Sequence, residues 1–145
     1  MTAPRILIAD DDAAIRTLMR AVAARRGFII DEAGDGSQCL GLLRRNTYDL
    51  LLLDLSMPFV NGFDVIARLR SERRRPAVVV VSALSRSALY DLDPDVVTCV
   101  LRKPFDVDVL ASIIAKLATA VHGTRVVQGR RATDRAQTAE AASIQ

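Results

Sequence analysis

Five short apolar runs alternate with amphipathic stretches along this chain, and this alternation restricts the possible folds more than any other feature. The runs cover residues 5–9, 28–33, 49–54, 77–82 and 96–101. Apart from the second, less apolar run, they are rich in consecutive Leu, Ile and Val residues, which is typical of strands that are covered on both faces. The sequence therefore predicts an α/β fold, a doubly wound five-stranded parallel sheet with about five helices on its two faces.

The stretches between the runs place apolar residues at helical spacing. The two stripes that matter below are Phe63, Ile66 and Leu69, and then Val107, Leu110, Ile114, Leu117 and Val121. The fourth stretch, residues 85–92, is short, and Asp93-Pro94-Asp95 follows it. Because proline disfavours helix in the preceding residue, we expect a short or irregular helix there.

Length and composition indicate one globular domain. The chain has 145 residues, of which 50% are hydrophobic and 26% charged, and a chain of this size can bury a core without staples. Cys39 and Cys99 lie in no metal-ligand spacing and are interpreted as small buried hydrophobes of a reducing cytosol. The domain is predicted to span residues 1–122. Residues 123–145 have little to bury and are predicted to be a disordered tail.

The N-terminus has no signal-peptide pattern, and no apolar run approaches the roughly 20 residues that span a bilayer. A cytoplasmic location without membrane contact is therefore predicted. The net charge is only +3. The basic run Arg68, Arg70, Arg73, Arg74 and Arg75 could contact a phosphate backbone, but a solvated helix end that complements the helix dipole is the favoured interpretation. Direct nucleic-acid binding is not predicted, and the lone His122 is interpreted as structural or solvated.

Polar side chains end or follow four of the five runs. They are Asp10, Asp11 and Asp12 after the first, Asp54 at the end of the third, Ser82 at the end of the fourth and Lys103 after the fifth. Ligands of open parallel sheets bind beyond the carboxyl ends of the strands, so these groups are expected to converge. Two charges about 4 Å apart interact by roughly 4 kcal/mol at an effective dielectric of 20, so the carboxylates must hold protons or a cation. Oxygen ligands favour Mg²⁺, whereas no His or Cys ends a run to favour zinc.

A carboxylate nucleophile, a divalent cation, an amine and a hydroxyl are the groups that phosphoryl transfer to an aspartate needs. Lys103 can pair with Asp54 at rest and with a phosphoryl oxygen after transfer, and Ser82 can donate to the same oxygen. One of the three consecutive aspartates is expected to cap the following helix, which leaves the other two unexplained by capping. The joint arrangement therefore predicts a functional site.

With these residues in view, the sequence resembles the receiver domain of bacterial two-component response regulators from about Arg5 to Val121. The motifs that carry the resemblance are Asp10-Asp11-Asp12, Leu-Leu-Leu-Asp54-Leu-Ser56-Met57-Pro58, Gly62, Ser82-Ala83 and Lys103-Pro104-Phe105. The resemblance implies a flavodoxin-like strand order of 2-1-3-4-5 and a cis peptide bond before Pro104. It also implies that Asp54 is phosphorylated from the phosphohistidine of a sensor histidine kinase or a histidine phosphotransfer protein.

The resemblance further implies a site and a role. The implied groups are Asp11 and Asp54 as direct Mg²⁺ ligands, the Ser56 backbone carbonyl as a third, Asp10 through water, and Ser82 and Lys103 as phosphoryl-binding groups. Such a domain is a signalling switch and not an enzyme in the usual sense, because it catalyses only its own phosphorylation and dephosphorylation. Phosphorylation would change its affinity for a protein target whose identity the sequence does not give.

Two positions affect what the resemblance implies, one because it departs from the family pattern and one because it affects the lifetime of the phosphoryl group. Val100 replaces an aromatic residue that turns inward when the family switches, and Leu84 occupies a position that affects hydrolysis of the phosphoryl group. Two further uses of the fold stay open. The chain could be the receiver part of a longer regulator with an output domain, or a pseudo-receiver that binds a partner without phosphorylation.

Overall fold

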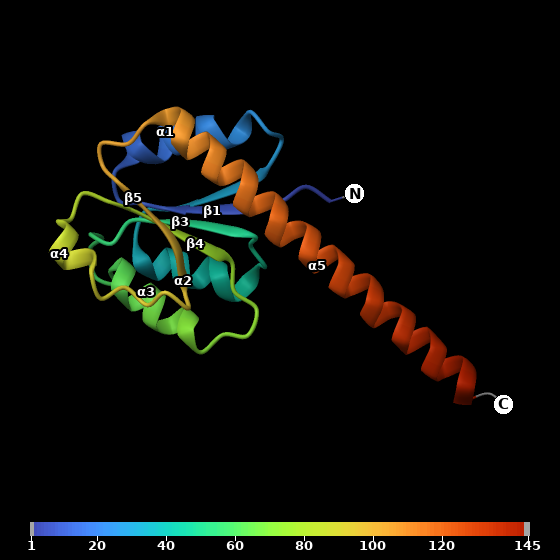
Figure 1. Cartoon of the computed structure of the whole chain (residues 1–145). Coiled ribbons are helices and arrows are strands. Elements are labelled where there is room, and N and C mark those ends of the chain that lie inside the picture. The colour runs from blue at the N-terminus through green and yellow to red at the C-terminus, as the bar shows by residue number, and fades with distance from the viewer. Residues whose placement is uncertain (1, 144–145) are drawn as a thin grey trace.

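The computed structural model describes residues 2–143 and confirms the predicted doubly wound fold. Five parallel strands form one sheet in the order β2-β1-β3-β4-β5, as the resemblance implied (Figure 1). The elements in chain order are β1 (Arg5–Ala9), α1 (Ala13–Ala24), β2 (Ile29–Ala33), α2 (Gly36–Arg45), β3 (Leu50–Leu53), α3 (Gly62–Arg70), β4 (Ala77–Ser82), α4 (Arg86–Leu89), β5 (Val97–Arg102) and α5 (Val107–Ser143).

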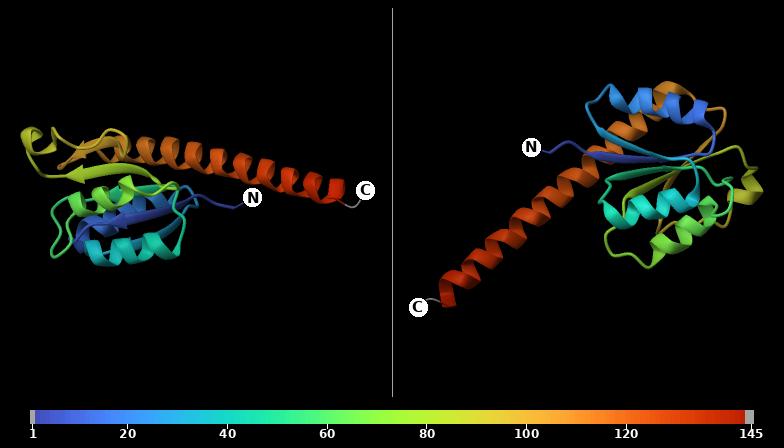
Figure 2. Two further views of the ribbon diagram at one scale, coloured as in Figure 1. Left: turned by 90° about the horizontal axis from the view of Figure 1, so that it is seen from below. Right: turned by 180° about the vertical axis from the view of Figure 1, so that it is seen from behind.

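The sheet separates two apolar cores, as the views in Figures 1 and 2 show. Helices α1 and α5 cover one face, and α2 and α3 cover the other. Successive residues of a strand point to opposite faces, so Ile6 packs with α1 and α5 whereas Leu7 packs with α2 and α3. All four side chains of the central strand β3 are 0% exposed. The continuous apolar runs of the sequence are therefore used on both faces.

Helix α4 confirms the prediction of a short fourth helix, since it has only four residues. The stripe predicted for α3 is wrong at one position. Phe63 is 41% exposed, whereas its neighbours Val65, Ile66 and Leu69 are buried. Because α3 begins at Gly62, capped by the Asn61 side chain, position 63 lies in the first turn on the solvent side.

Helix α5 is longer than the sequence predicted and extends beyond the sheet (Figure 1). The structure differs from the predicted disordered tail over residues 123–143, which are helical; residues 144 and 145 lie outside the described part. A helix does not require an apolar stripe, and this segment is rich in Ala, Arg and Gln, which have good helix propensity. Gly123 and Gly129 each oppose this by only about 1 kcal/mol.

Polar contacts attach α5 to the start of β3. The His122 imidazole lies 3.2 Å from Asp49 Oδ2 and 2.7 Å from the Thr2 carbonyl oxygen. The Arg125 guanidinium donates to the Tyr48 carbonyl and lies 3.5 Å from Asp49 Oδ1. His122 therefore has a structural role, in agreement with its interpretation from the sequence.

The first part of α5, Val107–Gly129, is long enough and apolar enough to cross a membrane by length and composition alone, with a mean hydropathy of 1.3. This corrects the expectation that no run approaches such a length. In the structure, however, Leu110, Ile114 and Ala118 of this segment are at most 1% exposed and pack against the sheet. Of the most apolar 18-residue stretch of the segment, 17% is buried. A core helix explains these residues as well as a membrane helix would.

Gly62 gives a direct test of how tightly the segment before α3 is packed. A Cβ at this position would lie 2.4 Å from the Asp54 carbonyl oxygen and 2.7 Å from Leu55 Cα, and neither backbone atom can move aside easily. We expect Gly62→Ala to lower the free energy of unfolding by about 1–3 kcal/mol in chemical denaturation.

The matched control is Gly123→Ala, because a Cβ there meets nothing within 4 Å. Helix propensity should make that variant more stable by up to about 1 kcal/mol. Equal effects of the two substitutions would show that the close approach at Gly62 is not a constraint.

Candidate functional site

Side chains that follow four strands meet at the carboxyl edge of the sheet. One carboxylate oxygen from each of Asp10, Asp11 and Asp54 lies within 4.8 Å of the other two. Lys103, which follows β5, reaches the same cluster, and Ser82 ends the neighbouring strand β4. The structure thus brings together the groups that the sequence placed in four separate segments.

The Lys103 ammonium has Asp10 as its nearer partner. Its Nζ atom lies 2.8 Å from Asp10 Oδ2 and 3.8 Å from Asp54 Oδ2, so the pairing with Asp54 expected from the sequence is the longer of the two. The reason is burial: Asp10 is 0% exposed, and a buried carboxylate requires a partner. The Lys103-Pro104 bond is cis, as the resemblance implied, and the Lys103 amide donates to the Ser82 carbonyl.

The loop after β1 is ordered by its own polar groups. The Asp12 carboxylate accepts from the Ala14 and Ile15 amides and caps α1, which confirms that one of the three aspartates is a cap. The Asp12 amide donates to Asp10 Oδ1 over 2.9 Å. Arg16 donates to the Asp10 carbonyl oxygen over 2.6 Å. Sequence reasoning missed Arg16, because no local pattern marks a side chain that bonds to a backbone carbonyl six residues earlier.

Asp54 is the buried carboxylate at the end of β3, with 4% exposure. The Ser56 amide donates to its Oδ1 atom over 3.3 Å. Burial raises the pKa of Asp54 to about 6, and the negative charge of Asp10 adds to this effect, while the Lys103 ammonium opposes it. Lys103 therefore compensates the cluster only in part, and a negative charge on Asp54 is costly without a further cation.

The donor set fits a magnesium ion. The three carboxylates offer hard oxygen ligands, and the group of metal-binding side chains found here among the described residues contains neither His nor Cys. Asp11 and Ser56 are exposed at the rim, where water can complete a coordination shell. The Ser56 carbonyl, Asp11 and Asp54 are the groups that could hold the ion, with Asp10 behind them.

Ser82 is fully buried next to this cluster, and its Oγ atom accepts from the Leu84 amide over 3.1 Å. Its own hydroxyl proton thus stays able to donate. Leu84 is partly buried and packs against the core beneath α2 and α3. Val100, at the position where the resemblance would place an inward-turning aromatic residue, is 39% exposed on the edge strand β5.

Sequence comparisons agree with this geometry. The family model described as the response regulator receiver domain matches residues 6–115. The transcriptional regulatory protein PdtaR of Mycobacterium tuberculosis is 31% identical over 131 residues, which cover 89% of this chain and 63% of that protein. The transcriptional regulatory protein ResD of Bacillus subtilis is 36% identical over 78 residues, which cover 54% of this chain and 32% of that protein. The chain therefore spans less than two thirds of the length of these curated relatives.

Solved structures are similar over nearly their whole length. The receiver domain of the Francisella response regulator 1452 has a TM-score of 0.74 and 29% sequence identity, covering 81% of this chain and 98% of that one. The response regulator TrrA of Thermotoga maritima, solved in complex with Mg²⁺ and BeF, has a TM-score of 0.71 and 30% identity, covering 79% of this chain and 98% of that one.

The raised pKa of Asp54 predicts an unusual pH dependence for the metal-free protein. The folded state binds this proton more tightly than the unfolded state, in which the pKa is near 3.8, so stability due to Asp54 is lost as the pH rises from about 4 to about 6. At pH 7, Asp54→Asn should therefore raise the free energy of unfolding by about 1–2 kcal/mol, after allowance for solvent screening.

Urea denaturation at pH 7 in a chelating buffer measures this gain. The control is Asp91→Asn, which removes an exposed carboxylate away from the cluster and should change stability little. Added Mg²⁺ should stabilise the wild-type protein and not the Asp54→Asn variant. A loss of stability in Asp54→Asn at pH 7 would show that the ionised carboxylate is well compensated by its neighbours.

Proposed function

The chain belongs to the response regulator receiver domain family, and on this premise we propose that it is a phospho-acceptor switch in which Asp54 receives a phosphoryl group. The donor would be a phosphohistidine of a sensor histidine kinase or of a histidine phosphotransfer protein. The transfer would depend on Mg²⁺ and would change the affinity of the domain for a protein target. Receiver domains are signalling modules of two-component systems and not enzymes of the usual kind.

The observation that carries the proposal is the environment of Asp54, whose carboxylate is buried, has a raised pKa and lies 3.8 Å from the Lys103 ammonium of the Asp10–Lys103 ion pair. An oxygen of its carboxylate would attack phosphorus as the bond from phosphorus to the donor imidazole breaks, and the imidazole nitrogen would keep the bonding electron pair. Lys103 would need to move little to contact a phosphoryl oxygen, since it already lies 3.8 Å from Asp54.

The remaining groups supply position and charge. The Ser82 hydroxyl would donate to a phosphoryl oxygen, because its oxygen already accepts from the Leu84 amide and its proton is left for another acceptor. Mg²⁺ held by Asp11, Asp54 and the Ser56 carbonyl, with Asp10 through water, would offset the negative charge that collects at the site. The domain would thus catalyse only its own phosphorylation and dephosphorylation.

We further propose that the protein works in the cytoplasm, where histidine kinases present their phosphohistidine. Both cysteines are free, and Cys39 is buried, which raises the pKa of its thiol to about 12 and suits an inert core residue. The receiver unit is proposed to end near residue 122, although α5 continues beyond it.

A second candidate is that the chain forms the receiver part of a longer regulator. The length of the relatives favours this reading, since the chain spans only 32% of ResD and 63% of PdtaR. Both of those proteins are named as transcriptional regulators. In that case α5 would connect the switch to an output domain, and the phosphorylation chemistry at Asp54 would be the same.

Incubation with Mg²⁺ and a small acyl phosphate, followed by intact mass measurement, tests the proposed function. We expect one phosphoryl adduct, which requires Mg²⁺ and is absent from Asp54→Asn. Lys103→Ala should form the adduct more slowly, by about 10²-fold or more, because a charged donor to the transferred group is lost. An unmodified wild-type protein under all conditions would overturn the proposal and leave a pseudo-receiver that binds its partner constitutively.

The lifetime of the adduct depends on access of water to the site. Leu84 is bulky and apolar, and its amide donates to the Ser82 hydroxyl oxygen, so its side chain should hinder an attacking water. We expect the phospho-form to last well beyond seconds, and we expect Leu84→Ala to lose its phosphoryl group several times faster. The decay of the adduct after removal of the donor measures both rates. Complete hydrolysis within seconds in the wild-type protein would contradict this role.

A further inference from the structure

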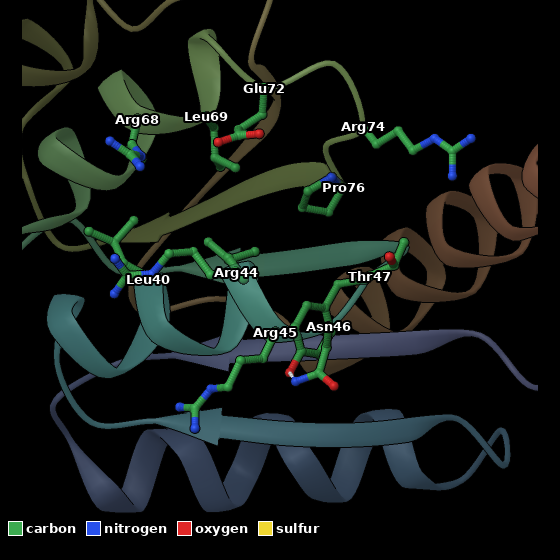
Figure 3. Close-up of a pocket in the computed structure, with 12 residues that line it drawn as sticks. Leu40, Arg44, Arg45, Asn46, Thr47, Arg68, Leu69, Glu72, Arg74 and Pro76 are labelled. Atoms are coloured by element: carbon green, nitrogen blue, oxygen red, sulfur yellow. Dashed lines mark hydrogen bonds between the residues drawn. The ribbon is translucent and has the colours of Figure 1, made fainter.

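Two adjoining hollows lie at the edge of the sheet opposite the acidic site. The first has a volume of about 410 Å³, and α2 forms one wall while the end of α3 and the loop after it form the other (Figure 3). The second has a volume of about 540 Å³ and lies between the residues before β4 and the middle of α5. Both are lined by Thr47 and Arg74, so they form one extended groove.

Among the described residues, seven of the 20 basic side chains of the chain line this basic groove. Within the same part of the chain, the charged lining residues are the arginines Arg44, Arg45, Arg68, Arg73, Arg74, Arg75 and Arg125 and the carboxylate Glu72. These residues together have a formal charge of +6. The rest of the chain, with 13 basic and 16 acidic residues, has a charge of −3. The modest net charge of +3 therefore conceals one strongly basic edge of the sheet.

Four of these arginines are available to a ligand. Within the described residues, the guanidinium groups of Arg44, Arg68, Arg73 and Arg74 make no hydrogen bond or ion pair, and all four side chains are exposed. Other arginines of the same sequence run are engaged, such as Arg70, which binds Asp93 over 2.7 Å. In the basic run, Arg70 and Arg75 thus make structural contacts, whereas the guanidinium groups of Arg68, Arg73 and Arg74 stay exposed.

Helix dipoles do not account for this charge. The C-termini of α2 and α3 lie at the groove and each contributes about −0.5 charge, which leaves about +5 uncompensated. A solvated helix end explains only the arginines at the end of α3. The tertiary structure brings Arg44 from α2 and Arg125 from α5 to the same place.

We propose that this groove binds the phosphate backbone of a nucleic acid. Guanidinium groups recognise phosphate oxygens by paired hydrogen bonds, and Asn46, Thr47 and Gln128 add neutral side chains of the kind that contact phosphates. The paired hollows suit a chain of repeated charges better than a single anion. Among the described lining residues the only aromatic one, Tyr48, is 1% exposed, so these residues offer no base stacking and the groove binds without sequence preference.

An acidic protein is a poorer match for the same surface. Protein interfaces usually centre on exposed aromatic or apolar anchors, whereas nucleic-acid interfaces are polar and strongly positive. The binding is distinct from phosphorylation, because the groove lies beyond the opposite ends of the strands from Asp54.

Fluorescence anisotropy with a labelled duplex of about 20 base pairs, at salt concentrations from about 50 to 200 mM, tests the proposal. Four phosphate contacts predict a slope of about −3.6 for the logarithm of affinity against that of salt, which is a fall of about 150-fold over this range. Arg68→Ala/Arg74→Ala removes two contacts, so its slope should be about −1.8 and its fall about tenfold.

The matched control is Arg25→Ala/Arg26→Ala, which removes two exposed arginines at the end of α1 that line neither hollow. It should keep the wild-type slope, although the net charge falls by the same amount. Cooperative urea unfolding and formation of the Asp54 adduct should be unchanged in both double variants, which shows that they are folded.

Three outcomes would overturn the proposal. Absence of binding at about 50 mM salt would show that the groove does not retain a polyanion under favourable conditions. Equal slopes in the two double variants would show that only net charge matters. Groove-dependent binding of poly-glutamate that is as tight as that of the duplex would assign the surface to an acidic protein instead.

Discussion

Two carboxylates, Asp10 and Asp54, end the adjacent central strands β1 and β3 in almost complete burial, and the surrounding structure is arranged around their repulsion. Lys103 compensates Asp10 at 2.8 Å but approaches Asp54 only to 3.8 Å. The consequence is a buried Asp54 carboxylate whose negative charge is only partly compensated by its described neighbours, so its pKa is raised to about 6. Such a carboxylate lowers the stability of the folded protein when it is ionised, and its pKa depends strongly on any charge that is added nearby.

The same parallel sheet that gathers carboxylates at one edge gathers arginines at the other. All strands run in one direction, so the residues that follow them share one edge and the residues that precede them share the opposite edge. Arg44 and Arg68 lie in the last turns of α2 and α3, which return the chain to that second edge. The separation of charge between the two edges is thus a consequence of topology, although it is hardly visible in the net charge.

The sequence predictions were incomplete or wrong where the outcome depends on packing between elements. The predicted pair of Lys103 with Asp54 is present at 3.8 Å, but the shorter pair with Asp10 was missed, because the spacing of residues does not show the burial of a carboxylate. Phe63 shared the helical spacing of Ile66 and Leu69, but the point at which α3 begins placed it on the solvent side. The length of α5 was underestimated because the apolar stripe ends at Val121. A segment without such a stripe has no packing energy from a core, but its residues can still have a high helix propensity.

The sequence by itself determined the layered fold, the strand ends at which polar groups appear, and the identity of those groups. These features follow from local patterns, since burial on both faces of a strand requires a continuous apolar run. Only the tertiary structure decided which arginines are free, how α5 is attached to Asp49 through His122 and Arg125, and that Arg16 orders the loop after β1. Each of these involves residues that are brought together by the packing of separate elements, and no local pattern records such a contact.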